Sequence, residues 1–222
     1  MTPENGRDDS AGSNARKERV ARRYDRWSRW YDAYDLGGVN AHKRAAVEVL
    51  ELAPGGSVLD VGTGTGAILP YLVERLGDGL AVGVDFSAAM VARARRRVGK
   101  RGIGDKVEVV AADVTALPYP DGCFDAALAT FAFTSFPEPE KAMREVARVL
   151  KPGARFSVLD TGKPPGKATL YYRYLKSVMW MAGYTDISMD VPGMLEKAGF
   201  RIERIDRFEH SYAYICLAVK CE

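Results

Sequence analysis

The fold of this 222-residue chain is decided by one stretch, Val58-Leu59-Asp60-Val61-Gly62-Thr63-Gly64-Thr65-Gly66-Ala67. Residues 57–61 are mostly apolar and β-branched, which is typical of a buried strand. Three alternating glycines follow, and apolar residues from Ala67 to Leu72 then indicate a helix. A strand, a glycine loop and a helix form the first half of a nucleotide-binding βαβ unit.

The residue before the glycines separates two possible ligands. Gly62-x-Gly64-x-x-Ala67 also satisfies the dinucleotide fingerprint, so an NAD(P)-dependent oxidoreductase stays open as an alternative. Asp60, however, stands two residues before the first glycine. Its carboxylate would repel a pyrophosphate, whereas it suits a ligand that carries ammonium and sulfonium groups. We therefore expect the cofactor S-adenosyl-L-methionine (SAM).

Composition narrows the class of protein. The chain is 47% hydrophobic and 27% charged, as expected for a globular α/β protein, and its net charge of +3 gives no argument for nucleic acid. Its three cysteines show no metal-ligand spacing and fit a reducing cytoplasm. Neither a secretory signal nor an apolar run of about 20 residues is present. We expect a cytoplasmic protein without a metal site.

The N-terminal region divides into a tail and a helix. Residues 1–15 read as a disordered tail, and residues 16–222 as one domain. Residues 16–38 combine an aromatic face with an arginine stripe at helical spacing. This helix either lies on the domain with solvated arginines or forms a lid that also contacts an anionic membrane surface or a substrate phosphate. Both interpretations stay open.

Strands and helices alternate along the rest of the chain. Strands are expected at residues 57–61, 80–84, 107–111, 124–130 and 155–159, and a terminal hairpin at 200–208 and 211–220. Helices are expected at 41–52, from 67 onward, and at 87–100, 138–150 and 191–198; the arginines of 87–100 should form a solvated face. This pattern predicts a Rossmann-like, doubly wound α/β fold, mostly parallel, with an antiparallel C-terminal strand.

Acidic and aromatic residues follow the expected strands. Asp85 lies about 20 residues beyond the glycines, where an acid accepts hydrogen bonds from both ribose hydroxyls. Asp113 ends the third strand and suits the adenine amino group, while Phe131 opens the segment where a substrate should meet the cofactor. The insert 162–190 contains an aromatic, methionine-rich helix that either packs at the core edge or walls the acceptor.

Four motifs give the chain a family resemblance. They are Tyr24-Asp25-x-x-Ser28-x-x-Tyr31-Asp32, Asp60-x-Gly62-x-Gly64-x-Gly66, Asp113-x-x-x-Leu117-Pro118-Tyr119, and Val149-Leu150-Lys151-Pro152-Gly153 leading to Leu159-Asp160-x-x-Lys163-Pro164. Over most of residues 18–220 the chain resembles the class I SAM-dependent methyltransferases. Within them it is similar to the ubiquinone/menaquinone biosynthesis C-methyltransferases and related phospholipid N-methyltransferases. The acceptor-lining Tyr-Leu-x-x-Ser-Ile segment of the quinone enzymes is missing, so both acceptor types stay open.

The resemblance implies a methyltransferase acting on a small, lipid-like acceptor, with a non-catalytic SAM-binding domain as a further alternative. Tyr31 would close over the cofactor, and Tyr31 and Phe131 would contact the sulfonium. No catalytic residue is assigned, although His42 and His210 are candidate bases, and the oligomeric state is not predicted. The cofactor-binding residues implied are Tyr31, Asp60, Gly62, Thr63, Gly64, Gly66, Asp85, Phe86, Met90, Asp113, Val114 and Thr130.

Overall fold

The computed structural model describes residues 20, 22, 25, 38–162, 177, 189–208 and 212–222. The expectations for the tail at 1–15, most of the helix at 16–38 and most of the insert at 162–190 therefore lie outside the described residues. Among the described residues, no helix is both long enough and apolar enough to cross a membrane.

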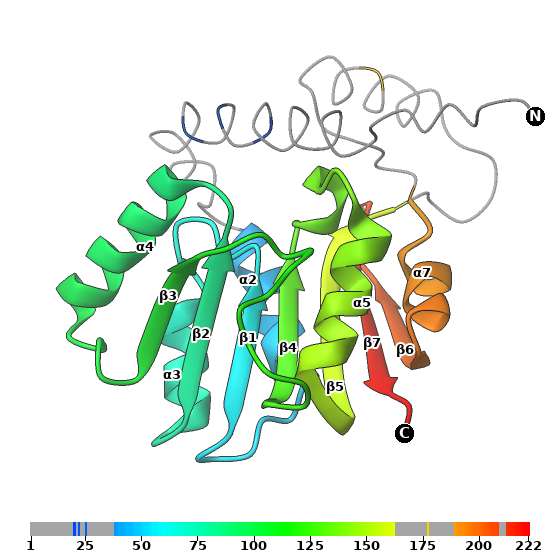
Figure 1. Cartoon of the computed structure of the whole chain (residues 1–222), viewed down its shortest axis with the longest axis horizontal. Coiled ribbons are helices and arrows are strands. Elements are labelled where there is room, and N and C mark those ends of the chain that lie inside the picture. The colour runs from blue at the N-terminus through cyan, green and yellow to red at the C-terminus, as the bar shows by residue number, and fades with distance from the viewer. Residues whose placement is uncertain are drawn as a thin grey trace, which may run out of the picture.

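Within the described residues, seven strands form one sheet (Figure 1). Five of them pair in parallel, and β7 runs antiparallel between β5 and β6, which confirms the predicted class and the terminal hairpin. Across the sheet the order is β3 (Val107–Ala111), β2 (Leu80–Asp85), β1 (Ser57–Val61), β4 (Phe124–Thr130), β5 (Leu150–Thr161), β7 (Ala213–Lys220) and β6 (Phe200–Arg207).

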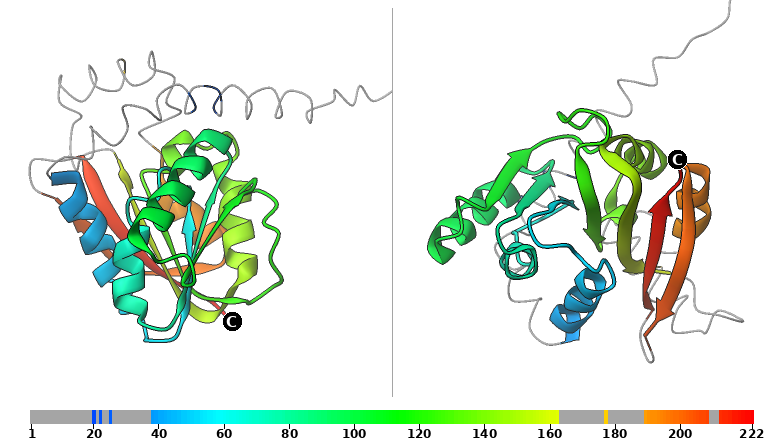
Figure 2. Two further views of the ribbon diagram at one scale, coloured as in Figure 1. Left: turned by 90° about the vertical axis from the view of Figure 1, so that its left-hand side faces the viewer. Right: turned by 90° about the horizontal axis from the view of Figure 1, so that it is seen from below.

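Helices cover both faces of the sheet, so the molecule has three layers (Figure 2). The helices α2 (Gly38–Glu48), α3 (Leu69–Leu76) and α4 (Ala88–Arg101) share one buried cluster with the sheet. The helices α5 (Pro139–Val149) and α7 (Val191–Lys197) share the other. Each helix presents apolar residues at helical spacing to the sheet, which is the pattern that the sequence predicts.

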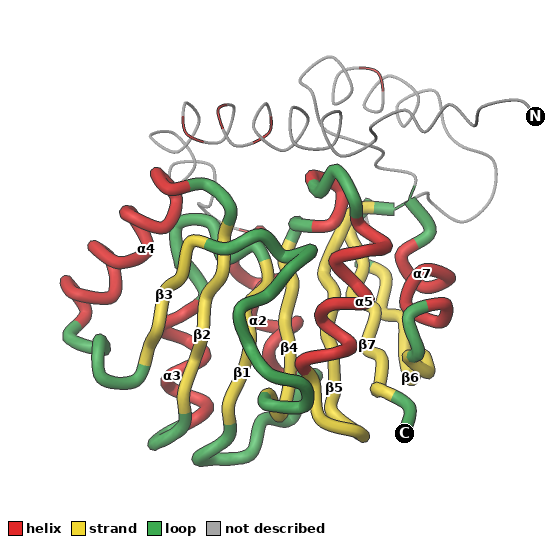
Figure 3. Tube along the Cα trace, in the orientation of Figure 1, coloured by secondary structure: helices red, strands yellow, loops and turns green. Residues whose placement is uncertain are grey.

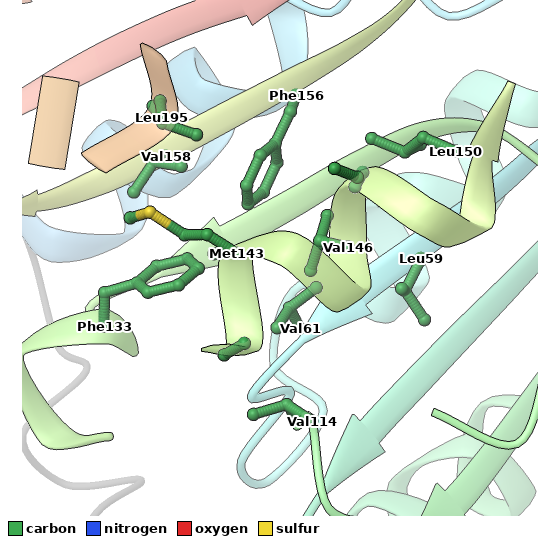
Figure 4. Packing of buried hydrophobic residues seen from close by; sticks show 14 of the residues in the cluster. Leu59, Val61, Val114, Phe133, Met143, Val146, Leu150, Phe156, Val158 and Leu195 are labelled. Carbon is green, nitrogen blue, oxygen red and sulfur yellow. The ribbon is translucent and has the colours of Figure 1, made fainter. Parts of the chain in front are cut away.

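The cluster under α5 shows how the central strands are held (Figure 4). Met143 of α5 and Leu195 of α7 are fully buried beside Phe156 of β5. Phe133, from the turn after β4, packs edge-on against Phe156 with their ring centroids 6.0 Å apart. This cluster therefore fixes the segment after β4, which belongs to the site described below.

Several element boundaries differ from the prediction (Figure 3): α2 covers residues 38–48 rather than 41–52, and two further differences have a local cause. The strand expected at residues 155–159 begins earlier, at Leu150, because Leu150 already pairs with Phe124 and pairing resumes between Arg155 and Ala126. The intervening residues form an irregularity in the strand pairing, and Gly153 adopts a φ of +75° there. The Pro-Gly pair at residues 152–153 therefore lies in a bulge within the strand. The helix after the glycines begins at Leu69 rather than Ala67, with a proline in its first turn.

Candidate functional site

A pocket opens at the carboxyl ends of the central strands, where the strand order reverses between β1 and β4. Open α/β sheets bind their ligands at such a position. The loops after β1, β2, β3 and β4 all contribute to the wall. Its described lining residues are Val20, Gly62, Gly64, Asp85, Phe86, Ser87, Met90, Asp113, Val114, Thr115, Thr130, Phe131, Ala132, Ser135, Phe136, Pro137 and Glu138.

The three glycines of the loop after β1 have different surroundings, although all have positive φ values. A Cβ on Gly62 would lie 2.8 Å from the Cβ of Ala132, and a Cβ on Gly66 would lie 2.9 Å from that of Ala94. A Cβ on Gly64 would meet nothing within 4 Å. Gly62 and Gly66 therefore permit close packing inside the protein, whereas Gly64 leaves bare backbone facing open space in the pocket.

Asp85 ends β2 and holds the glycine loop in place. Its Oδ2 accepts a hydrogen bond from the backbone N–H of Gly64 at 2.9 Å, and its Oδ1 accepts one from Ser87 at 2.9 Å. Burial raises the pKa of Asp85 to about 6, although both backbone donors oppose the shift. Because a carboxylate oxygen has two lone pairs, each oxygen can accept one further hydrogen bond from a ligand in the pocket.

The loops after β2 and β3 are fixed by side-chain caps. Ser87 caps α4 by accepting a hydrogen bond from the N–H of Met90 at 3.2 Å, and it also bonds to the carboxylate of Asp25. Asp113 accepts hydrogen bonds from the N–H and the hydroxyl of Thr115 at 2.9 and 2.7 Å. These bonds hold both loops against the pocket in a defined shape.

The wall after β4 includes a strained residue that the sequence does not signal. Phe131 has a φ of +55°, a value that bulky residues rarely adopt, and its N–H donates to the carbonyl of Leu159 at 2.7 Å. The chain then forms a short 3₁₀ turn, η1 (Phe133–Ser135), before Phe136. Such strain persists only where the surrounding structure enforces it, and it clusters at functional sites.

Asp160, near the end of β5, enforces that turn. Its carboxylate accepts hydrogen bonds from the N–H and hydroxyl of Thr134, at 3.2 and 3.0 Å, and from the N–H of Thr161 at 2.8 Å. The residue is 0% exposed, and burial raises its pKa to about 6. It does not line the pocket. Sequence reasoning placed Asp160 after the fifth strand but did not find this role, because the contact joins residues 26 positions apart.

The structure brings most of the predicted residues to one wall. The lining set contains Gly62, Gly64, Asp85, Phe86, Met90, Asp113, Val114 and Thr130. Thr63 and Gly66 lie outside it: Thr63 packs against Gly83 of β2, and Gly66 packs against α4. Tyr31 lies outside the described residues.

Asp60 is also absent from the pocket lining. Its side chain is 1% exposed, and neither carboxylate oxygen has a hydrogen-bond partner in the described structure. Burial raises its pKa to about 6, while the nearby hydroxyl of Thr63, which makes no hydrogen bond of acceptable geometry to it, and the charge of Lys43 oppose the shift. A buried acceptor without a donor is costly, so this position suits a cation or an ordered water molecule.

The candidate bases are not gathered at the pocket. The ring of His42 stacks on Phe208 with centroids 3.9 Å apart, and His42 does not line the pocket. His210 lies outside the described residues. Within the part of the chain that the structure describes, no group of three or more His, Cys, Asp or Glu side chains is placed to hold a metal ion.

The charges of the wall discriminate between the two cofactors considered. The charged residues among the described lining are Asp85, Asp113 and Glu138, all carboxylates. A pyrophosphate would face these acids without a compensating lysine or arginine among them, whereas a positively charged ligand is attracted. The residues present therefore fit SAM, which when bound supplies an electrophilic methyl group on its sulfonium.

Comparisons with known proteins agree with a SAM-binding site. Residues 59–158 match the family model described as a methyltransferase domain. A demethylmenaquinone methyltransferase of Thermus thermophilus is 41% identical over 167 residues, covering 74% of this chain and 73% of that protein. A phosphatidylethanolamine N-methyltransferase of Cereibacter sphaeroides is 37% identical over 141 residues, covering 64% of this chain and 67% of that protein.

A solved structure gives the same assignment. The crystal structure of a SAM-dependent methyltransferase from Aquifex aeolicus superposes with a TM-score of 0.64 at 30% identity, covering 80% of this chain and 88% of that one. Together with the glycine loop, the strand-end carboxylates and the strand order, these matches show that the chain belongs to the class I SAM-dependent methyltransferases.

Proposed function

We propose that this methyltransferase acts on a small, lipid-like acceptor. The observation that carries the proposal is the composition of the pocket, whose described lining combines three carboxylates with several apolar and aromatic side chains. Asp85 and Asp113 come from the loops after β2 and β3. Glu138 comes from the segment after β4, which also supplies the apolar residues Phe131, Ala132, Phe136 and Pro137. A ring or acyl chain would gain by burial against these side chains.

On this proposal the residues divide their roles along the wall. Asp85 accepts hydrogen bonds from the ribose hydroxyls, and Asp113 and Val114 contact the adenine. The bare backbone at Gly64 approaches the methionine portion. The apolar segment after β4 aligns the acceptor atom with the methyl carbon. Alignment of two reactants is worth roughly 7–11 kcal/mol, so positioning is the main contribution that this wall makes.

Two acceptor types have specific support. The relative from Thermus thermophilus, named as a demethylmenaquinone methyltransferase, favours a quinone precursor. All charged residues of the described pocket lining are carboxylates, and they attract an ammonium group. This charge favours an amine acceptor such as an ethanolamine headgroup. An ammonium group must lose a proton before its nitrogen attacks the methyl carbon, and a carbon acceptor activated by a phenol must lose one as well, so either acceptor needs a base. Glu138 is the carboxylate nearest in sequence to the apolar segment.

We further propose that residues 16–222 form one methyltransferase domain after a tail at 1–15. Residues 16–38 would act as a lid with Tyr31 over the cofactor, and 162–190 would flank the acceptor. Two described residues support the lid: Val20 lines the pocket, and Asp25 bonds to Ser87.

Labelled SAM and a total lipid extract test the acceptor class. We expect label in the lipid fraction, and purified phosphatidylethanolamine vesicles and a demethylated quinone, offered separately, then identify the acceptor type. The variant Asp85→Ala serves as the control for cofactor-dependent labelling. Label confined to protein or RNA would overturn the proposal. Calorimetry with SAM and NADH, without acceptor, checks the cofactor independently.

A further inference from the structure

The outer face of α4 carries a continuous row of cations. Its residues follow the spacing i, i+3, i+4, i+7 and i+8, so they share one side of the helix, while Met90, Val91, Ala94 and Val98 are buried on the other. A shallow hollow on the surface is lined, among the described residues, by these cations alone. We call them the α4 stripe: Arg93, Arg96, Arg97, Lys100 and Arg101.

Packing accounts for only part of the α4 stripe. Arg97 donates from Nη1 to the carbonyl and hydroxyl oxygens of Thr65, and so braces the glycine loop. Arg96, Lys100 and Arg101 are exposed, and none of them forms an ion pair with another described residue. The helix contains no acidic residue. Like charges four residues apart destabilise a helix, so the fold alone gives no reason for this arrangement.

The α4 stripe begins close to the pocket. Phe86 and Ser87, directly before α4, and Met90 in its first turn line the pocket. Arg93 follows Ser87 by six positions, which is about 9 Å along a helix. Phe86 is 45% exposed although it is large and apolar. In Figure 1, α4 lies beside the edge strand β3 with its first turn toward the carboxyl ends of the strands.

We propose that the α4 stripe is a docking surface for an anionic phospholipid bilayer. Cations near an anionic leaflet are attracted to it, and an exposed aromatic residue beside them suits the boundary between headgroups and acyl chains. Docking on this face brings the pocket rim to the source of a lipid-like acceptor. The inference goes beyond the proposed function and does not depend on it, because attraction to the leaflet requires no acceptor.

A bilayer fits the α4 stripe better than a nucleic acid does. Proteins that bind single-stranded nucleic acid interleave cations with aromatic side chains on which the bases stack. Residues 93–101 contain no aromatic residue, and the net charge of the chain is only +3. The exposed aromatic residue nearest in sequence is Phe86, at the pocket rim rather than within the row of cations.

Vesicle sedimentation with the full chain tests the proposal. We compare phosphatidylcholine vesicles with vesicles that also contain phosphatidylglycerol, in the absence of SAM and of any acceptor. Wild type should bind the anionic vesicles selectively, and added salt should weaken the binding. The triple variant R96E/K100E/R101E, which leaves Arg97 and its bonds intact, should bind them about tenfold more weakly or worse.

A second triple variant provides the control. Lys141 and Arg144 on α5 and Lys197 on α7 are exposed and lie on the opposite face of the sheet. K141E/R144E/K197E changes the net charge equally and should bind anionic vesicles like wild type. SAM calorimetry on both variants confirms the fold. Equal losses in the two variants, wild type that ignores phosphatidylglycerol, or an α4 stripe that binds RNA but not vesicles would each overturn the proposal. Because no acceptor is present, such a failure leaves the proposed function standing.

Discussion

Two aspartates at the ends of parallel strands hold the site together in the same way. Asp85 ends β2 and binds the N–H of Gly64, in the loop after the neighbouring strand β1. Asp160 lies near the end of β5 and binds the N–H of Thr134, in the turn after the neighbouring strand β4. Each also binds a backbone N–H just beyond itself. Equivalent hydrogen bonds therefore hold the loops on both sides of the point where the strand order reverses, between β1 and β4.

The two aspartates differ in access to the pocket. Asp85 lines it and keeps room for a ligand, whereas Asp160 is fully buried and its oxygens serve only the protein among the described contacts. Access to the pocket, rather than the type of bond, therefore distinguishes the two acids. Removing Asp160 should therefore affect stability most, and removing Asp85 should affect cofactor binding most.

The largest effect is expected for Asp160→Ala. The substitution leaves the buried N–H and hydroxyl of Thr134 without an acceptor, and a buried unsatisfied group costs about 1–3 kcal/mol. We expect the free energy of unfolding in urea to fall by about 2–4 kcal/mol. Asp160→Asn, which retains one acceptor oxygen, should lose less. A variant as stable as wild type would show that η1 is held by its packing alone.

For Asp85→Ala we expect SAM affinity to fall by about 1.5–3 kcal/mol, the range for hydrogen bonds to a charged group. Calorimetry measures the dissociation constant, and urea unfolding separates this effect from loosening of the glycine loop. Asp85→Asn keeps the size of the side chain and should retain part of the binding. An unchanged dissociation constant in Asp85→Ala would place the ribose elsewhere.

The glycine loop allows a matched pair of substitutions. Gly62→Ala places a methyl group 2.8 Å from the Cβ of Ala132, whereas Gly64→Ala meets no protein atom within 4 Å; both carry the strain of a positive φ, about 1–2 kcal/mol. We expect Gly62→Ala to lose more stability, measured by thermal unfolding. Gly64→Ala should lose more SAM affinity relative to its stability, because its methyl group occupies ligand space. The reverse ranking would contradict the placement of the pocket.

The smallest effect concerns pH. The pKa of Asp85 is raised to about 6, so its carboxylate takes up a proton as the pH falls through 6 and loses acceptor capacity. SAM affinity should weaken from pH 7 to pH 5, by at most tenfold per pH unit for one proton. This pH dependence of SAM affinity should be smaller in Asp85→Asn and unchanged in Asp160→Asn. Any pH dependence that is left in Asp85→Asn is attributed to Asp60, whose pKa is also raised to about 6. A flat profile in wild type would exclude this role.

The raised pKa values have the opposite consequence for stability: SAM affinity should increase with pH, whereas the free energy of unfolding should decrease. Asp85 and Asp160 hold a proton more tightly in the folded chain than at their ordinary pKa of 3.8. Their contribution to the free energy of unfolding therefore decreases as the pH rises from about 4 to about 6. Urea titrations of Asp160→Asn at these two pH values should show a smaller decrease than wild type.

Local patterns predicted the fold well. The bounds of β1, β3 and β4 agree with the prediction, because apolar runs and turn residues mark buried strands directly. The position of Asp85 at a strand end was likewise predicted from its spacing after the glycines, and that of Asp113 from its place after the third strand.

Contacts between segments that are distant in the sequence could not be predicted from local patterns. The left-handed backbone of Phe131 and the bond between Asp160 and Thr134 depend on how β4 and β5 align, which no local window contains. The start of β5 at Leu150 was not predicted, because the Pro-Gly pair at residues 152–153 indicates a break between elements although it lies in an irregularity within the strand. The burial of Asp60 away from the pocket wall also follows from tertiary packing rather than from its motif.

The antiparallel insertion of β7 constrains the order in which the sheet is assembled. During synthesis β6 emerges before β7, yet it pairs with no strand except β7 among the described residues. Until Ala213–Lys220 leave the ribosome, β5 presents an open edge and Phe200–Arg207 have no neighbour to pair with. Nascent chains that stall in this interval would expose unpaired strand edges, the form most prone to aggregate and to need a chaperone.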